Sequence, residues 1–287
     1  MHPYYRICTS PKKFSEQMQW LAGNGYRGVT LSEGLAAFTH PLTVDPRPFG
    51  ATKRCAGGFK PIVLTFDDGF RDFYTAAAPI LHKHRFTATM FLSTGFIGDT
   101  RAFFTPSAGD LIKNQKSKIK NGRECLTWKE VLELHSKGIE FGSHTVSHPE
   151  LDGLFWNDVE LEIRRSKREI ESRLGAPCTT FAYPYAFPSA NAKFLQAFTA
   201  LLKNAGVQFG VTTAIGRASY ADKEKSPLTL KRLPVNSSDD LSLFKAKING
   251  RYDWMGWPQT LSKRVKAVAK GQRSTNEPTL QTASERR

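Results

Sequence analysis

Two adjacent carboxylates, Asp67 and Asp68, stand between an apolar stretch of the chain and Gly69. The five residues 62–66 before them are apolar or β-branched without polar alternation, which predicts a strand buried on both faces. Two ionised carboxylates this close repel each other in a dry environment, and a bound metal ion would relieve that repulsion. The alternative for the same residues is a strand followed by a plain Asp-Gly turn, because glycine lets the chain reverse sharply.

His144 and His148 form the second chemical pattern. They follow a short apolar segment, residues 139–141, just as the carboxylates follow a strand. A spacing of four residues places two imidazoles on one side of a helical turn, so both can reach one ion; a chance pairing is the alternative. One Asp and two His make three protein ligands and leave positions for water and substrate, which is typical of a catalytic metal site.

Three segments together resemble the motifs of a known family. They are Thr65-Phe-Asp-Asp-Gly69, Ser143-His-Thr-Val-Ser-His148 and Phe181-Ala-Tyr-Pro-Tyr185. The first two, in this order, are similar to the first two motifs of the polysaccharide deacetylases, the NodB-homology or carbohydrate esterase 4 group. The third resembles a variant of the third motif, and the resemblance covers roughly residues 10–250.

The resemblance implies a role for each matched residue. Asp68, His144 and His148 would hold a divalent ion, with zinc expected, and Asp67 would be the general base. A backbone N–H near Tyr185 would stabilise the oxyanion together with the ion. The implied fold is a distorted (β/α) barrel of about seven strands.

The third segment combines a candidate sugar site with a departure from the family pattern. Tyr183, Pro184 and Tyr185 resemble a sugar-stacking wall, because aromatic rings bury the apolar face of a pyranose. Ala182 stands where the family usually has an Arg that orients the catalytic Asp. Arg232, in the last predicted strand, is a candidate to supply that charge; an exposed strand residue is the alternative.

Two further family features are missing. Ala186 replaces the usual Gly after the third motif, and no His occurs after His148. The late Leu-x-His motif, whose His protonates the leaving amine, is therefore absent, and His2 is a weak candidate to replace it.

These residues need a frame that brings distant parts of the chain together. Strands are predicted at residues 28–31, 62–66, 87–92, 139–141, 179–182, 207–212 and 229–235. Strand–helix alternation of this kind builds a parallel sheet, open or closed into a barrel. The carboxylate pair, the histidine pair and the tyrosine segment each follow a strand, and in a parallel α/β barrel such strand ends share the face that carries the active site.

The sequence also predicts where helices begin, which helix face is exposed, and where one long insertion lies. Side-chain caps are expected at Ser10, Thr127, Asn157 and Ser238 or Asp239. The Arg, Lys and Glu residues of the helix that ends before Gly175 are expected on a solvated face. Residues 96–123 form a long irregular insertion, either a lid or groove wall or a disordered excursion.

Composition favours one large domain with a basic character. The chain has 287 residues, 40% of them apolar, a net charge of +15 and a pI near 9.7. This charge favours anionic partners or surfaces, but no aromatic-interleaved basic motif points to nucleic acid. Residues 1–270 are expected to form a NodB-like domain, and residues 271–287 a disordered basic tail.

No stretch approaches the ~18 apolar residues of a membrane helix. The N-terminus also lacks the apolar core of a signal peptide, so the chain as written is expected in the cytoplasm. Relatives of this type often begin with an earlier strand, so a shortened N-terminus and a lost export signal form the alternative. The four cysteines are scattered and do not suggest a disulfide framework.

Three functions fit these observations. The leading hypothesis is a metal-dependent amide hydrolase that removes acetyl groups from N-acetylated sugars of a polysaccharide or lipid-linked glycan. A same-fold amidase acting on a small non-sugar amide is the second, and a non-catalytic glycan-binding barrel is the third. A zincin-type protease is excluded, because Thr145 stands where that motif requires a Glu.

Overall fold

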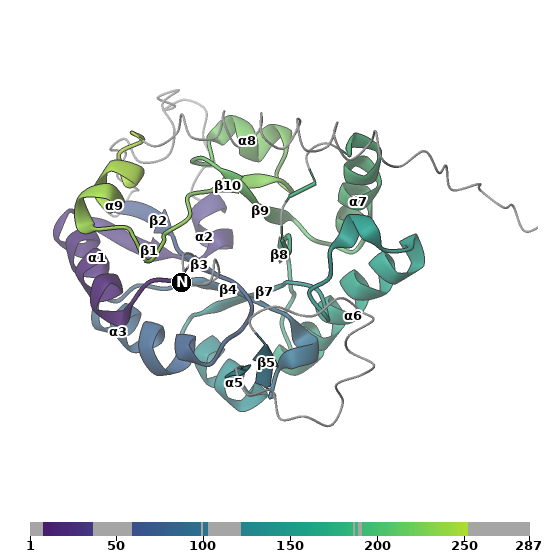
Figure 1. Cartoon of the computed structure of the whole chain (residues 1–287), viewed down its shortest axis with the longest axis horizontal. Coiled ribbons are helices and arrows are strands. Elements are labelled where there is room, and N and C mark those ends of the chain that lie inside the picture. Colours follow the sequence, from purple (N-terminus) through teal and green to yellow (C-terminus); the bar gives the residue numbers. More distant parts are fainter. Residues whose placement is uncertain are drawn as a thin grey trace, which may run out of the picture.

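Parallel strands form the centre of the molecule (Figure 1). The computed structural model describes residues 8–36, 59–98, 100–102, 122–185, 187–188 and 191–251. Most of the predicted insertion, the predicted tail at 271–287 and the candidate acid His2 lie outside the described residues. None of the helices within the described ranges combines the length and apolar character needed to cross a bilayer.

The main sheet has six parallel strands in the order β10-β9-β8-β7-β4-β3. Their bounds are β3 Thr65–Phe66, β4 Thr89–Leu92, β7 Glu140–Ser143, β8 Thr180–Ala182, β9 Phe209–Ile215 and β10 Leu230–Arg232. A separate parallel pair joins β1 (Tyr26–Val29) to β2 (Lys60–Val63). Only Leu64 separates β2 from β3, so the two continue one line of chain and seven parallel segments result. The predicted α/β class and distorted barrel of about seven strands are confirmed.

Helices surround this sheet. Their bounds are α1 Pro11–Gly23, α2 Leu31–Ala36, α3 Ala78–Lys83, α5 Trp128–Ser136, α6 Trp156–Leu174, α7 Ala192–Asn204, α8 Tyr220–Lys225 and α9 Leu241–Ile248. In Figure 1 the strands curl around a central region, with α1, α3, α5, α6 and α7 along the outside. A π-helical turn, Phe73–Ala77, precedes α3, so the predicted helix over 71–85 is split next to Pro79.

Helix α2 differs from the others because it packs inside the curl of the sheet. Leu31 and Leu35 are buried in one cluster with Phe91, Val211 and Leu230 from the strands. A curled sheet must fill its interior with side chains, and α2 supplies part of that filling. The interior is therefore a packed core below the strand ends.

Two of the predicted helix caps are confirmed and one is wrong. Ser10 accepts a hydrogen bond from the N–H of Lys13, and Thr127 forms a capping box with Glu130. At α6 the N-cap is Phe155, without a side-chain cap, so the prediction of Asn157 is wrong. Helix α6 begins at Trp156, which places Asn157 already within its first turn.

The cap of α9 is also shifted from the predicted residue. Asp240 accepts from the N–H of Leu243, whereas Asp239 forms a buried ion pair with Lys247. The carboxylate of Asp239, which the local pattern assigned to the cap, is thus paired with Lys247 instead.

The stem of the predicted insertion is ordered as a strand pair. β5 (Thr100–Ala102) and β6 (Gly122–Glu124) are antiparallel. Arg71, just after the carboxylate turn, bonds Glu124 of this stem and Glu130 of α5. The ends of the insertion are thereby attached next to the carboxylates. The prediction that residues 96–123 are irregular is wrong for residues 100–102 and 122–123, which lie in these strands.

The strand before the carboxylates is more exposed than its sequence predicts. Every residue of β2 and β3 is only partly buried. β3 is an edge of the six-stranded sheet, and a cavity of about 810 Å³ borders residues 61–68 on one side and residues 230–236 on the other. The prediction of burial on both faces is wrong, because this cavity leaves one side of the strand partly open.

Candidate metal centre

Asp68, His144 and His148 converge at the carboxyl ends of β3 and β7. One ligand atom from each lies within 4.8 Å of the others. Asp68 Oδ1 is 3.3 Å from His148 Nε2 and 3.7 Å from His144 Nε2. β4 lies between β3 and β7 in the sheet, so parallel register brings together residues that are far apart in sequence.

The geometry of these three residues fits a divalent ion. Tetrahedral ligands at about 2.0–2.2 Å from zinc lie roughly 3.4 Å from one another, close to both measured separations. His144 Nδ1 lies 2.8 Å from the carbonyl oxygen of Ala182. A carbonyl only accepts, so Nδ1 carries the proton and Nε2 presents its lone pair toward Asp68. The structure thus fixes the tautomer that metal ligation requires.

Asp67 faces a different partner from its neighbour. Arg232 donates two parallel bonds to its carboxylate, with Nη1–Oδ1 and Nη2–Oδ2 both at 2.8 Å. The same guanidinium donates to the carbonyl of Thr212 at 2.9 Å and to the hydroxyl of Thr65 at 3.2 Å. A planar donor fork of this kind fixes both position and orientation of a carboxylate. The family pattern has an Arg at the position of Ala182, and in this structure Arg232 of β10 pairs with Asp67 instead.

This pairing controls the ionisation of Asp67. Burial alone would raise the pKa of its carboxyl, but the charges of Arg232, His144 and His148 and the hydrogen bonds from Arg232 lower the pKa to about 2. Asp67 is consequently ionised at neutral pH. An ionised carboxylate beside an ion site is able to accept a proton.

Unusual backbone conformations gather at the same place. Among the described non-glycine residues, five have positive φ, and four of them are Asp68, Thr145, His148 and Tyr185. Such conformations cost free energy at non-glycine residues and persist where surrounding contacts enforce them. Four of these conformations therefore lie at the ends of β3, β7 and β8, where the candidate metal ligands meet.

The tyrosine segment divides into one exposed and two buried residues. Tyr185 is 37% exposed, and its ring lies 4.5 Å, centroid to centroid, from that of His148. Tyr183 is only 1% exposed and packs against Phe181, Phe187 and Phe198. The prediction that Tyr183 and the also buried Pro184 form a sugar-stacking wall is wrong, because neither offers a free face.

Sequence reasoning missed one residue at this site, Glu162 of α6. Its carboxylate accepts bonds from the backbone N–H groups of Val146 and Ser147, which lie between the two histidines. The prediction that the charged residues of α6 form only a solvated face is therefore wrong for Glu162. A signal was present, because Glu162 is one turn before Ser166, which belongs to the buried face of the helix.

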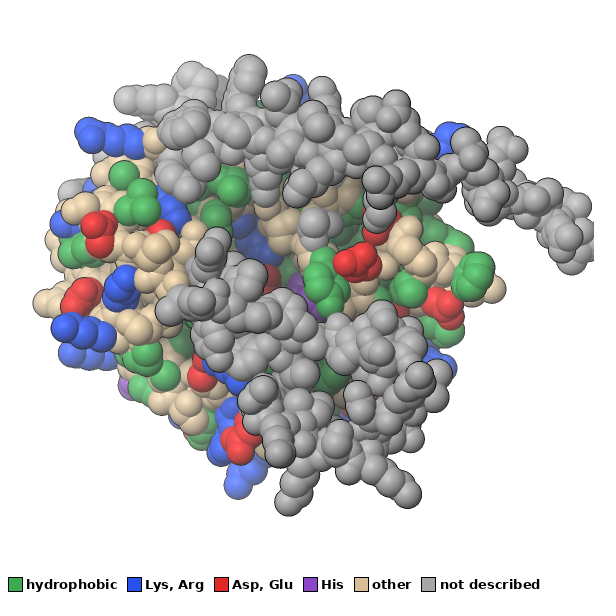
Figure 2. All heavy atoms as spheres, in the orientation of Figure 1, with side chains coloured by type: hydrophobic (Ala, Val, Ile, Leu, Met, Phe, Trp, Pro, Cys, Tyr) green, Lys and Arg blue, Asp and Glu red, His purple; other side chains and the backbone are tan. Residues whose placement is uncertain are grey.

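Figure 2 shows a hollow near the middle of this face, in which cationic, acidic and histidine side chains are visible between hydrophobic ones. Asp67, Asp68 and Arg232 border the cavity of about 810 Å³ at the open seam between β3 and β10. Both carboxylates are thus next to space that a ligand and water can enter.

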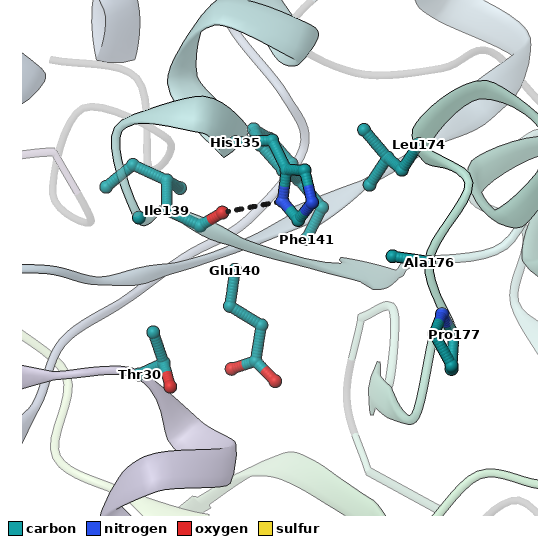
Figure 3. Close-up of a pocket in the computed structure, with 9 residues that line it drawn as sticks. Thr30, His135, Ile139, Glu140, Phe141, Leu174, Ala176 and Pro177 are labelled. Atoms are coloured by element: carbon teal, nitrogen blue, oxygen red, sulfur yellow. Dashed lines mark hydrogen bonds between the residues drawn. The ribbon is translucent and has the colours of Figure 1, made fainter.

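A second, smaller pocket lies at the opposite end of β7 (Figure 3). Its volume is about 210 Å³, and Glu140 is its acidic residue. That carboxylate is occupied, because it accepts bonds from the N–H groups of Leu31 and Ser32 and from the hydroxyl of Thr89. His135 in the same pocket contacts the carbonyl of Ile139. These contacts hold the start of α2 and explain Glu140 without a ligand.

Comparison with family models matches residues 56–210 to the model described as "Polysaccharide deacetylase". The match spans more than half of the 287 residues and includes both the carboxylate pair and the histidine pair. The chain belongs to the polysaccharide deacetylase family.

Curated relatives extend this family membership over most of the chain. YxkH of Bacillus subtilis (strain 168), whose name also refers to polysaccharide deacetylases, is 29% identical over 237 residues, which cover 83% of this chain and 69% of YxkH. The poly-beta-1,6-N-acetyl-D-glucosamine N-deacetylase of Escherichia coli (strain K12) is 31% identical over 131 residues. That match covers 45% of this chain but only 16% of the E. coli protein.

Solved structures of deacetylases share the fold. The Streptococcus pyogenes deacetylase PplD, solved in complex with acetate, superimposes with a TM-score of 0.62 at 25% identity, covering 84% of this chain and 87% of PplD. IcaB from Ammonifex degensii gives a TM-score of 0.60 at 20% identity, covering 86% of this chain and 95% of IcaB. The second likeness concerns the fold alone.

Proposed function

We propose that this protein is a metal-dependent hydrolase that removes N-acetyl groups from N-acetylated sugars of a polysaccharide or other glycan. The observation that carries the proposal is the pairing of two units at one strand end. Asp68, His144 and His148 form a three-ligand cluster, and Asp67 beside it is held ionised by Arg232. A ligand cluster with an adjacent base is what metal-assisted hydrolysis requires.

Asp68, His144 and His148 would hold the ion, and zinc is the expected one because a mixed nitrogen and oxygen ligand set suits it. When bound, such an ion lowers the pKa of water and polarises an acyl oxygen. Three protein ligands leave room for water and substrate, as in catalytic zinc sites.

The remaining roles belong to the residues around this cluster. Asp67 accepts the proton of the attacking water, whose oxygen bonds to the acetyl carbon. Arg232 keeps that carboxylate oriented and ionised. A backbone N–H near Tyr185 donates to the oxygen of the tetrahedral intermediate. The C–N bond then breaks as the proton held by Asp67 passes to the leaving nitrogen, and acetate and the sugar amine leave.

The proposed substrate rests on the family and on one exposed ring. The family name refers to polysaccharides, and the name of the E. coli relative refers to an N-acetylglucosamine polymer. Tyr185 offers a partly exposed ring beside His148, where it would contact the apolar face of a sugar.

Acetate release from a panel of N-acetylated oligosaccharides tests the proposal. The protein is loaded with zinc and compared with a chelator-treated sample and with small non-sugar amides. We expect zinc-dependent acetate release from at least one oligosaccharide. Release only from small amides would favour an amidase, and tight binding of oligosaccharides without release would favour a glycan-binding protein; either result would contradict the proposal.

A further inference from the structure

The loop between the two histidines is held by a side chain from outside the site. Glu162 of α6 accepts from the N–H of Val146 at 2.7 Å, from the N–H of Ser147 at 2.9 Å and from the hydroxyl of Ser147 at 2.8 Å. Both carboxylate oxygens take part, one with two bonds and the other with one. Three donors converging on one ionised acceptor give charge-assisted bonds, which are stronger than neutral ones.

This loop needs an external acceptor because of its own conformation. Thr145 and His148 both have positive φ, at 67° and 56°. Non-glycine residues held in this region are strained and persist only where surrounding contacts enforce the conformation. Within the loop, the N–H of His148 bonds the hydroxyl of Thr145, but the N–H groups of Val146 and Ser147 point to α6. Without an acceptor there, these partly buried N–H groups would lose their partners.

Helix α6 also contacts the strand just before the loop. The hydroxyls of Ser143 and Ser166 lie 2.7 Å apart, and Ser166 is one turn beyond Glu162. Ser166 in turn donates to the carbonyl of Glu162 at 2.7 Å. One face of α6 therefore holds the chain on both sides of His144.

Two other glutamates of the same helix, Glu169 and Glu160, make ordinary surface pairs. Glu169 accepts from Arg173, and Glu160 lies near Arg164; each pair is formed one turn apart along the helix. Exposed pairs of this kind contribute little to stability. Glu162 differs because it faces the backbone of the loop.

We propose that Glu162 is a positioning residue for the metal centre: through the loop backbone it sets the placement of His148 relative to His144 and Asp68. This inference rests on the proposed metal site. Groups that hydrogen-bond to metal ligands, and so orient them, affect metal affinity; removing such a group typically weakens binding by about 10–100-fold. Glu162 does so through the peptide groups between the ligands.

Zn²⁺ binding tests this role directly. The metal-free full-length protein and its variants are titrated with Zn²⁺ in competition with a chromophoric chelator, and their melting temperatures are measured with and without the ion. The variants are Glu162→Ala, which removes the acceptor, and Glu162→Gln, which keeps the shape but loses the charge. Glu169→Ala is the matched control from the exposed face of the same helix.

We expect Glu162→Ala to bind Zn²⁺ about 10–100-fold more weakly than wild type, and Glu162→Gln to show a smaller loss. The rise in melting temperature on adding Zn²⁺ should shrink in both variants and stay unchanged in Glu169→Ala. A folded Glu162→Ala with wild-type Zn²⁺ affinity would overturn the inference. Should that variant fail to fold, wild-type affinity in Glu162→Gln would overturn it.

The same titration separates this inference from the proposed function. Asp68→Asn serves as a reference in which a ligand itself is changed. If wild type binds Zn²⁺ no more tightly than Asp68→Asn, the metal site and the role of Glu162 both fail. If wild type binds tightly and releases acetate while the Glu162 variants also bind tightly, only the role of Glu162 fails.

Discussion

Asp67 and Asp68 are neighbours in sequence, but their carboxylates meet different partners. Asp68 points to the two imidazoles, and Asp67 points across the open seam to Arg232. The positive φ of Asp68, 78°, marks the place where the chain turns between them. Local geometry at the end of β3 thus gives two identical side chains two separate roles in the proposed reaction.

Removing Arg232 tests the link to the proposed base. In Arg232→Met, the Asp67 carboxylate loses its donor fork and its counter-charge. We expect the zinc content to stay near that of wild type and the rate of acetate release to fall by about 10–100-fold, the range for losing an orienting partner. Metal analysis and initial rates on the same samples measure both. Unchanged rates would show that Arg232 only joins the two sheet edges and does not support the proposed base.

The same substitution changes how stability depends on pH. The folded-state pKa of Asp67 is about 2, below the ordinary 3.8, so its ionised form stabilises the fold fully above about pH 4. This contribution is lost as the pH falls from about 4 toward 2. Denaturant unfolding at several pH values should therefore show a smaller acid-induced loss of stability in Arg232→Met than in wild type. Parallel pH curves for the two proteins would contradict the assigned pair.

At the scale of elements, β10 depends on α9 for its anchoring. Lys247 and Asp239 are each only 1% exposed, and Lys247 Nζ lies 2.6 Å from Asp239 Oδ2 and 2.7 Å from the carbonyl oxygen of Pro234. Pro234 is two residues beyond Arg232, so this link holds the end of the strand that presents the guanidinium.

Breaking this buried pair should be costly. In Lys247→Met the carboxylate of Asp239 stays buried without its cation, and such losses typically destabilise a fold by about 3–5 kcal/mol. Denaturant unfolding measures the change. Lys83→Met, at an exposed residue of α3, is the control and should change stability by less than ~0.5 kcal/mol. A similar small effect for Lys247→Met would refute the anchoring role.

Local signals in the sequence predicted the elements well. The caps at Ser10 and Thr127 depend on residues within one turn, so the pattern alone suffices. The cap of α9 does not, because Asp239 has a partner eight residues away and Asp240 replaces it. Where two candidate caps are adjacent, tertiary contacts decide.

The three candidate metal ligands were predicted correctly to lie together, but the residues around them were predicted less well. Parallel strand ends explain why Asp68 and the histidines meet, and strand patterns reveal this. Tyr183 was assigned wrongly because strand alternation places it on the side of Phe181, facing the helices. Helix periodicity places Glu162 next to the buried face of α6, but a side-chain pattern does not identify the loop backbone as its partner.

At the scale of the whole molecule, the open seam of the sheet brings the proposed site together. Asp67, directly after β3, and Arg232 on β10 are at opposite edges of the six-stranded sheet, and their pairing joins those edges. The metal cluster joins β3 to the loop after β7. Ligation should consequently stabilise the entire fold.

Metal removal tests this coupling. A ligand that binds only the folded state stabilises it by about 2.7 kcal/mol at a concentration 100-fold above its Kd. We expect the melting temperature to fall on chelation and to recover on adding zinc. A melting temperature that does not respond to zinc would contradict a folded-state metal site.

The central claim is that Asp68 holds the ion while Asp67 takes the proton. The most direct test measures bound zinc per chain and acetate release on wild type, Asp67→Asn and Asp68→Asn, all loaded under the same conditions. Asp67→Asn should keep the ion and lose about 10²–10⁴-fold in activity, the range for removing a positioned proton acceptor. Asp68→Asn should lose the ion first. Full activity with full zinc occupancy in Asp67→Asn would contradict the mechanism.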